Sequence, residues 1–470
     1  MLIFIIKNSF LYYTSTLINI ISRIVYIILI ARFLGPDLYG IISYSQSWYM
    51  SFLPFTLFGF GLVIINTLSS KNKNKENIFS EILSIRLLLI SASVLICLSI
   101  SLFYIEDNTS TLLLNIFCLA LIGRSIYQWS DEIFISYEKA SLSLKFETGF
   151  RLAETIFGIF LIIKTQNLIY IALNHSLLWL AQGLFALYIS KTRLITISIT
   201  LKSSVILKHL KNSLPLGISA ALNGLLFTIP ILFYKQSGAT NNLIGNLSVN
   251  IQALIVIGSL FIAISKAALP SLNRSLSTNS REITTYINIM LRIAIVFGSI
   301  VGILGLAFGE QVIFYVLNEK YAYAGINLGI TLYILIPFIM LQAIGGVLIP
   351  HNKFWYVCNT NIIGIVILIT SLSILIPLLN YTGVIISLLT GYFAMAFYGL
   401  FTLTRTIKTV RINLFIRAIT VCLFALILFL LLPLSNGPKA LISILLLLFG
   451  SYQFKIITKK EKLFIKNILS

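Results

Sequence analysis

Long apolar segments alternate with short polar stretches along nearly the whole chain. A transmembrane helix needs about 20 predominantly apolar residues to cross the hydrocarbon core of a bilayer. By this criterion we predict fourteen transmembrane helices. They span about residues 10–34, 40–66, 80–105, 110–135, 146–164, 168–190, 211–234, 243–270, 283–308, 327–350, 355–379, 383–404, 412–433 and 438–457.

The fifth segment, 146–164, is the least apolar, because Glu147, Arg151 and Glu154 lie in its first half. The last two segments fit either two full crossings or one re-entrant hairpin. The chain ends on the same side of the membrane in both cases, so we predict twelve to fourteen crossings.

Positive charges between the helices predict the orientation. With the N-terminus placed inside, the inner loops and termini carry 23 of the 34 lysines and arginines, and the outer loops carry 5. Inner loops of membrane proteins are enriched in these residues. Since the asymmetry alternates from loop to loop, we expect both termini in the cytoplasm, as in a multi-pass protein of a bacterial cytoplasmic membrane.

The composition excludes several classes of protein. The 470 residues are 58% hydrophobic and only 10% charged, whereas a soluble domain has about 25% charged residues. The net charge of +20 lies between apolar segments rather than on one solvated face, so we expect no nucleic-acid partner. No loop is long enough for a catalytic domain and no phosphate-binding loop is present, which predicts that the protein is not an enzyme and needs no cofactor.

A short internal repeat suggests how the helices are grouped. The residues Lys7-Asn8-Ser9 begin the first helix, and Lys211-Asn212-Ser213 begin the seventh, on the same predicted side of the membrane. Parallel repeats of this kind relate two bundles about an axis along the membrane normal. We therefore predict an all-α integral membrane fold with six-helix bundles at 1–200 and 201–408, followed by two further helices and a basic tail at 409–470.

The segment 31–40 follows the first predicted helix and has the sequence Ala-Arg-Phe-Leu-Gly-Pro-Asp-Leu-Tyr-Gly. It resembles the turn after the first helix in the polysaccharide transporter family, which contains the Wzx-type flippases for O-antigen and capsule repeat units. Weaker similarities lie at 319–325 and 263–272. The resemblance implies the MATE-like fold of the MOP superfamily, which also includes the lipid II flippases. Chemically, Gly35-Pro36 is a helix stop and turn, so we interpret the first motif as structural.

Charged residues inside the predicted helices are the candidate functional residues, because a charge at mid-bilayer costs about 2.5–3.5 kcal/mol unless it faces a cavity or a partner. The resemblance implies that a pyrophosphate binds in a cationic central cavity. Arg23, Lys266 and Arg292 are our candidates for this site. Arg86 lies near the inner surface, where we expect it to snorkel, and we interpret His175 as a core residue.

The fourth and fifth helices form a hairpin that should pair opposite charges. Folding it places Arg124 at about the depth of Glu154, and Asp131 or Glu132 near Arg151. These pairs would either lock the bundle or act as an ion-coupled gate, and both interpretations stay open. We therefore predict gating or ion-pair residues Arg124, Asp131, Arg151 and Glu154.

The preferred function is a flippase that moves undecaprenyl-pyrophosphate-linked oligosaccharide units across the membrane by alternating access. Its partners would be this substrate, membrane lipids, and a polysaccharide polymerase and chain-length regulator, with proton or sodium coupling as an option. The alternatives are a MATE-type multidrug exporter and a lipid II-type flippase. A membrane-bound polymerase or glycosyltransferase fits poorly, because it needs large outer loops.

Overall fold

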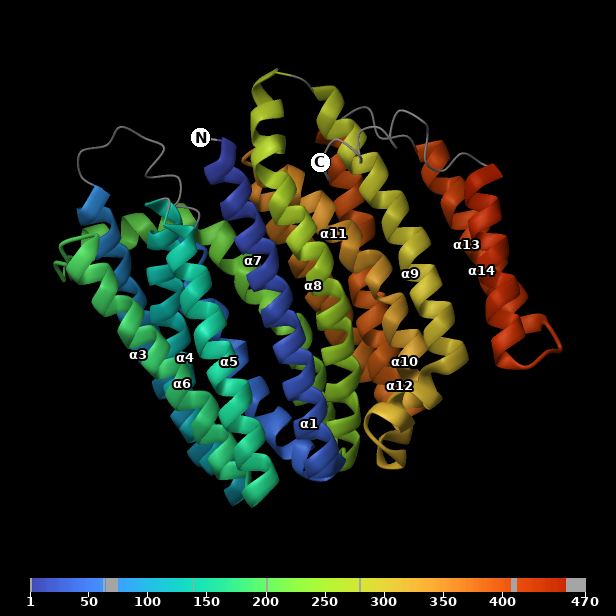
Figure 1. The fold of residues 1–470 in the computed structure, drawn as a ribbon, viewed down its shortest axis with the longest axis horizontal. Helices are drawn as coiled ribbons and strands as arrows, with labels where there is room; N and C mark the ends of the chain where they lie inside the picture. The colour runs from blue at the N-terminus through green and yellow to red at the C-terminus, as the bar shows by residue number, and fades with distance from the viewer. Residues whose placement is uncertain are drawn as a thin grey trace. The chain divides into compact units, whose positions relative to one another are not determined.

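The computed structural model describes residues 2–61, 64, 75–137, 139–199, 202–278, 280–406 and 412–453. Within these ranges the chain is helical apart from short connections, and no strand occurs there (Figure 1). Side chains are described for these residues except 2–17, 75, 140, 263–282 and 412–414. The helices are α1 (Leu2–Leu57), α3 (Lys75–Phe103), α4 (Asn108–Ser136), α5 (Ala140–Thr165), α6 (Leu168–Arg193), α7 (Ser203–Gln236), α8 (Asn241–Thr278), α9 (Ser280–Val316), η1 (Glu319–Tyr321), α10 (Ala322–Tyr333), α11 (Leu335–Leu348), α12 (Phe354–Thr406), α13 (Ile412–Leu431) and α14 (Asn436–Gln453).

Two of the helices are each long enough for two crossings. The described span Ile18–Leu57 has 40 residues and Phe354–Thr406 has 53. At 1.5 Å per residue, the shorter one measures about 60 Å, twice the thickness of the hydrocarbon core. Each contains one residue with positive φ, Gly35 at 72° and Asn380 at 51°, which separates two helical segments.

The described helices correspond to the fourteen predicted segments when α1 and α12 are counted as two each and α10 with α11 as one. Nine candidate membrane spans are found in the described residues by length and composition. The segment that we considered least apolar does form a helix, α5. The prediction of an all-α, multi-pass membrane fold is therefore confirmed.

Residues 1–248 form the first of two compact units, and α1 contacts α3, α4, α5 and α7 within it. Helices α4 and α6 approach each other closely at Gly123 and Gly183. A Cβ atom at Gly123 would lie 2.3 Å from the carbonyl oxygen of Trp179, so only glycine permits this approach. Phe79 of α3 and Trp129 of α4 belong to a buried apolar cluster that joins these two helices.

Residues 249–470 form the second compact unit. Its α9 carries four glycines that pack against α10 and α11, as expected for small residues at a membrane helix interface. A Cβ atom at Gly305 would lie 2.7 Å from Gly329 Cα, and one at Gly309 would lie 2.6 Å from the Gly325 carbonyl oxygen. Apolar side chains of α13 and α14 pack on α9 in the same unit. Our predicted boundaries at 200 and 408 stay predictions.

The motif at 31–40 has a structural role in the first unit. Gly35 forms the break in α1, and Pro36 begins the next helical segment. A Cβ atom at Gly40 would lie 1.9 Å from the Asn241 carbonyl oxygen, and Asp37 accepts a hydrogen bond of 3.1 Å from Asn242 Nδ2. The motif therefore forms a turn and a close contact with the start of α8, rather than a binding site.

Candidate functional site: a cationic network in the first unit

Charged and polar side chains gather inside the first unit, where α1, α4, α5 and α6 meet. Arg124 lies on α4, Arg151 and Glu154 lie on α5, and His175 lies on α6. Glu154 is 5% exposed and the other three side chains are partly buried. All four residues lie within the segments that we predict to be transmembrane helices, so these helices bring several charged groups together at one place.

A chain of hydrogen bonds connects three of the helices with α1. Tyr49 Oη accepts a hydrogen bond of 3.3 Å from Arg124 Nη1, and it shares one of 2.8 Å with His175 Nε2. The other ring nitrogen of His175, Nδ1, lies 2.5 Å from Glu154 Oε1. His175 is therefore satisfied at both nitrogens, as we expected for a core histidine, but its partners are ionisable groups.

Trp179 of α6 supports two guanidinium groups at once. The Arg151 guanidinium lies 3.7 Å from the centre of the indole ring, and that of Arg124 lies 4.5 Å from it. Arg151 also forms an ion pair with Glu154 and donates a hydrogen bond of 2.9 Å to Gln182 Oε1. Cation–π contacts stabilise a desolvated cation by about 2 kcal/mol, so the indole helps to hold both arginines inside the membrane.

Arg23, our first candidate for pyrophosphate binding, belongs to the same network. Its side chain is exposed, and it interacts electrostatically with Arg124, Tyr49 and Glu154. With His175 neutral, the three arginines, Glu154 and Glu147, which also interacts with Arg151, have a net charge of +1. An arginine at mid-bilayer needs water, a ligand or a partner, and Arg23 is the arginine of this group that a ligand can reach.

The α4–α5 hairpin contains an ion pair that we did not predict. Arg151 pairs with Glu154 of the same helix, α5, and Asp131 accepts a hydrogen bond from Ser143 Oγ. Glu132, however, pairs with Arg86 of α3 rather than with Arg151, at 3.1 Å.

The expectation that Arg86 snorkels to the inner surface is wrong. Its side chain is 0% exposed. Besides the pair with Glu132, it donates a hydrogen bond of 3.4 Å to the Ser125 carbonyl oxygen. A carboxylate on the neighbouring helix makes burial more favourable than extension to the surface.

The other two candidates for pyrophosphate binding lie in the second unit. Arg292 of α9 is 2% exposed, and its Nε donates a hydrogen bond of 2.5 Å to the Asn288 carbonyl oxygen. The backbone of Lys266 is part of α8, but its side chain lies outside the described residues.

Sequence reasoning missed Tyr49, Trp179 and Gln182, which hold the charged groups of the network in place. One signal was available on α6. His175, Trp179 and Gln182 are spaced by four and three residues, which places them on one face of a helix. A polar and aromatic face of this kind on an apolar helix predicts burial against other polar groups.

The sequence was compared with protein-family profiles and with curated proteins. The profile described as "Polysaccharide biosynthesis protein" matches residues 5–276. No curated protein matches the chain.

Several solved structures have the same fold. The lipid II flippase MurJ in an inward closed conformation is 16% identical with a TM-score of 0.69, over 96% of this chain and 99% of that one. The eukaryotic MATE transporter AtDTX14 is 14% identical with a TM-score of 0.60, over 84% and 94%. A MOP superfamily transporter from Pyrococcus furiosus is 15% identical with a TM-score of 0.54, over 84% and 94%.

At these identities the likeness concerns the fold alone. Each of the three structures is named as a flippase or a transporter, in agreement with our prediction that the chain is not an enzyme. The match to the family profile covers more than half of the 470 residues. The chain therefore belongs to the polysaccharide biosynthesis protein family.

Proposed function

We propose that the protein is a flippase for undecaprenyl-pyrophosphate-linked oligosaccharides, the repeat units of an O-antigen or a capsule. The observation that carries the proposal is the net positive network of Arg23, Arg124 and Arg151 inside membrane-spanning helices. A net positive charge inside the membrane is unfavourable in free energy unless an anion binds there. The family's description as polysaccharide biosynthesis proteins supports a lipid-linked sugar as the source of that anion.

The three arginines have different roles in this proposal. Arg23 contacts the pyrophosphate, because its side chain is exposed. Arg124 and Arg151 are both held on Trp179, and Arg124 adds to the positive potential at Arg23. Charge-assisted contacts with phosphate oxygens strengthen in a low-dielectric site, so a few arginines suffice to attract the doubly charged group. In the second unit, Lys266 of α8 and Arg292 of α9 stay our candidates for pyrophosphate binding.

The same network supplies a candidate gate. The ion pair between Arg151 and Glu154 lies beside the hydrogen-bonded His175. A pyrophosphate that attracts the arginines competes with Glu154 for them, so substrate and gate are linked. Protonation of the Glu154–His175 pair, or sodium binding, would provide ion coupling. Asp131 remains a further candidate at the α4–α5 hairpin.

The proposal includes a cellular setting. We place the protein in a bacterial cytoplasmic membrane with both termini in the cytoplasm, on the basis of the loop charges. A polysaccharide polymerase and a chain-length regulator would take up the product on the outer side.

A lipid II-type flippase is the second candidate, because the MurJ structure matches 96% of this chain, whereas the eukaryotic MATE transporter and the Pyrococcus furiosus transporter each match 84%. Both candidates transport a pyrophosphate-linked lipid. A MATE-type exporter of cationic drugs is disfavoured, since a net positive network repels a cation.

A reconstituted transport assay tests the proposal. Purified protein is placed in vesicles with a fluorescent undecaprenyl-pyrophosphate oligosaccharide, and an impermeant quencher measures the label that reaches the outer leaflet. We expect flipping by the wild type, a decrease of at least tenfold in Arg23→Gln, and normal rates in Lys164→Gln, which removes an exposed charge of α5 outside the network. Equal rates in all three proteins would refute the site, and no flipping of any such lipid would refute the function.

A further inference from the structure

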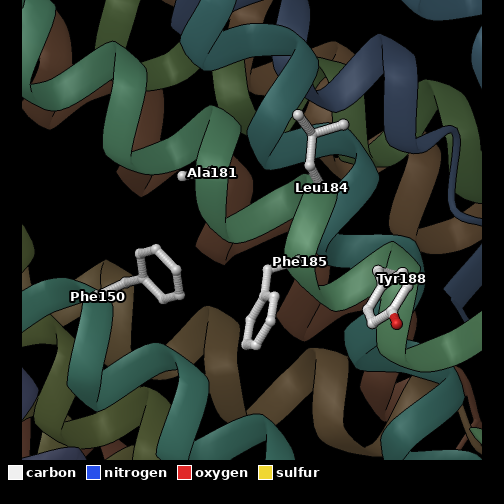
Figure 2. Close-up of a pocket in the computed structure, with 5 residues that line it drawn as sticks. All are labelled: Phe150, Ala181, Leu184, Phe185 and Tyr188. Carbon is white, nitrogen blue, oxygen red and sulfur yellow. The ribbon is translucent and has the colours of Figure 1, made fainter.

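An open apolar depression of about 590 Å³ lies on the surface of the first unit, between α5 and α6. Phe150 extends from α5 toward Ala181 and Phe185 of α6, and Leu184 and Tyr188 complete the lining (Figure 2). The α6 residues of this lining are exposed. We call this depression the α5–α6 groove. The residues of α6 lie in a candidate membrane span, and we predict that α5 crosses the membrane as well, so the groove would face lipid rather than water.

Basic residues lie at one end of both helices. Lys145 lies at the start of α5, five residues before Phe150, and Lys191 lies at the end of α6, three residues after Tyr188. Consecutive membrane-spanning helices run in opposite directions, so the start of α5 and the end of α6 lie at the same membrane surface. Lys145, Lys191 and Arg193 are all exposed there.

The helical register connects this basic end with the apolar groove. On α6 the exposed residues Ala181, Leu184, Tyr188 and Lys191 are spaced by three, four and three positions, which places them on one face. From Ala181 to Lys191 this face measures about 15 Å along the helix axis. That is half of the hydrocarbon core, so the face reaches from mid-bilayer to the surface in a single leaflet.

The acidic residue of α5 nearest to this surface is Glu147. Glu147 interacts electrostatically with Arg151 and Tyr127, which are residues of the interior. Its charge is therefore engaged inside the unit, and the outer face of the hairpin end presents its lysines. On α5, a Cβ atom at Gly149 would meet nothing within 4 Å, so the space beside Phe150 is open.

We propose that the α5–α6 groove binds one anionic phospholipid of the surrounding membrane. The phosphate group lies between Lys145 and Lys191, and one acyl chain occupies the groove along Phe150, Ala181 and Phe185. Basic pockets between transmembrane helices attract anionic headgroups, and an apolar groove below them orders the chain. In the proposed orientation this lipid belongs to the cytoplasmic leaflet.

The site is distinct from the proposed substrate site. Arg151 and Gln182 face the interior network, whereas Phe150 and Ala181, their neighbours in sequence, line the groove. A bound lipid would therefore lie against the outer side of the two helices that carry the network. It would hold α5 and α6 together without entering the path of the sugar.

Retention of lipid by the full-length protein tests this proposal. The protein is purified in detergent, incubated with phosphatidylglycerol or phosphatidylcholine, and the bound lipid is counted by native mass spectrometry. We expect one phosphatidylglycerol to be retained in preference to phosphatidylcholine. Lys145→Gln with Lys191→Gln should weaken its binding about 30-fold, since each of the two charges contributes about fivefold. Ala181→Phe, which fills the groove, should abolish it.

Two control variants separate the site from general effects. Lys164→Gln removes an exposed lysine at the opposite end of α5, and Ile156→Phe enlarges an exposed α5 side chain that does not line the groove. Both should bind phosphatidylglycerol normally.

The proposal would be overturned by equal retention of the two phospholipids, or by normal phosphatidylglycerol binding in Ala181→Phe. Retention of undecaprenyl phosphate but not of phosphatidylglycerol would overturn it as well, because the groove would then bind the substrate's lipid. No oligosaccharide is present in this experiment, so its outcome is independent of whether the protein flips one.

Discussion

The buried ion pair between Arg86 and Glu132 provides the most direct test of how the first unit tolerates charge. Arg86 Nη2 donates to both carboxylate oxygens of Glu132, at 3.1 and 3.4 Å, and neither side chain is more than 7% exposed. Removing one partner from a buried pair costs about 3–5 kcal/mol, because the other charge is left without compensation. We therefore expect Glu132→Leu to lower the unfolding free energy by this amount.

The double substitution should be much milder. When Arg86→Met accompanies Glu132→Leu, no charge remains buried, and apolar replacements of similar volume are often neutral or stabilising. The Ser125 carbonyl oxygen loses a hydrogen bond of 3.4 Å, which is long and contributes little. We expect the double variant to regain most of the loss and to transport normally.

Titration with a denaturing detergent, followed by tryptophan fluorescence, measures the unfolding free energies of the wild type, both single variants and the double variant. If a single variant does not fold, the cycle still gives a result through the double variant, which should be recovered in nearly wild-type amounts. A loss of less than about 1 kcal/mol in both single variants would refute the reasoning, as would a double variant less stable than either single one.

Three further predictions concern packing, the network and a helix cap. Gly123→Ala should destabilise the protein by about 1–3 kcal/mol, because its Cβ would collide with the Trp179 carbonyl oxygen, whereas Gly149→Ala, in open space, should not. Arg124→Gln should lower flipping at least tenfold in the vesicle assay with little change in stability. Asp107→Ala should cost about 1 kcal/mol at neutral pH by removing the N-cap of α4. Burial tends to raise the pKa of Asp107, but hydrogen bonds from the first turn of α4 outweigh it and hold the pKa below its usual value. The cap therefore stabilises α4 fully at pH values above the usual pKa of an aspartate, and this stabilisation is lost as the pH falls through the lowered pKa of Asp107. The melting curves of the wild type and of Asp107→Ala should therefore converge in acid.

The sequence by itself determined the membrane-spanning helices. Their length is set by the bilayer, and their apolar composition is a local property that any window of about 20 residues reveals. The sequence also indicates the packing face of α9, since Gly298, Gly302, Gly305 and Gly309 repeat at a spacing that places them on one side of the helix. The family motif at 31–40 was recognisable because Gly35-Pro36 breaks a helix whatever surrounds it.

Only the tertiary structure decided which charges meet. Glu132 was equally compatible with Arg151 and with Arg86, because sequence spacing gives depth in the membrane but not the neighbouring helix. Arg86 appeared close enough to the surface to reach water, yet a carboxylate 46 residues away holds it inside.

The cationic network depended on the same information. Tyr49 and His175 are 126 residues apart and share one hydrogen bond, and Trp179 lies under two arginines from different helices. The hydrophobic pattern fixes each helix separately, because it reflects the partition of each segment into lipid. The pairing of charges depends on how helices rotate and pack against one another, and this is decided by contacts between residues far apart in the chain.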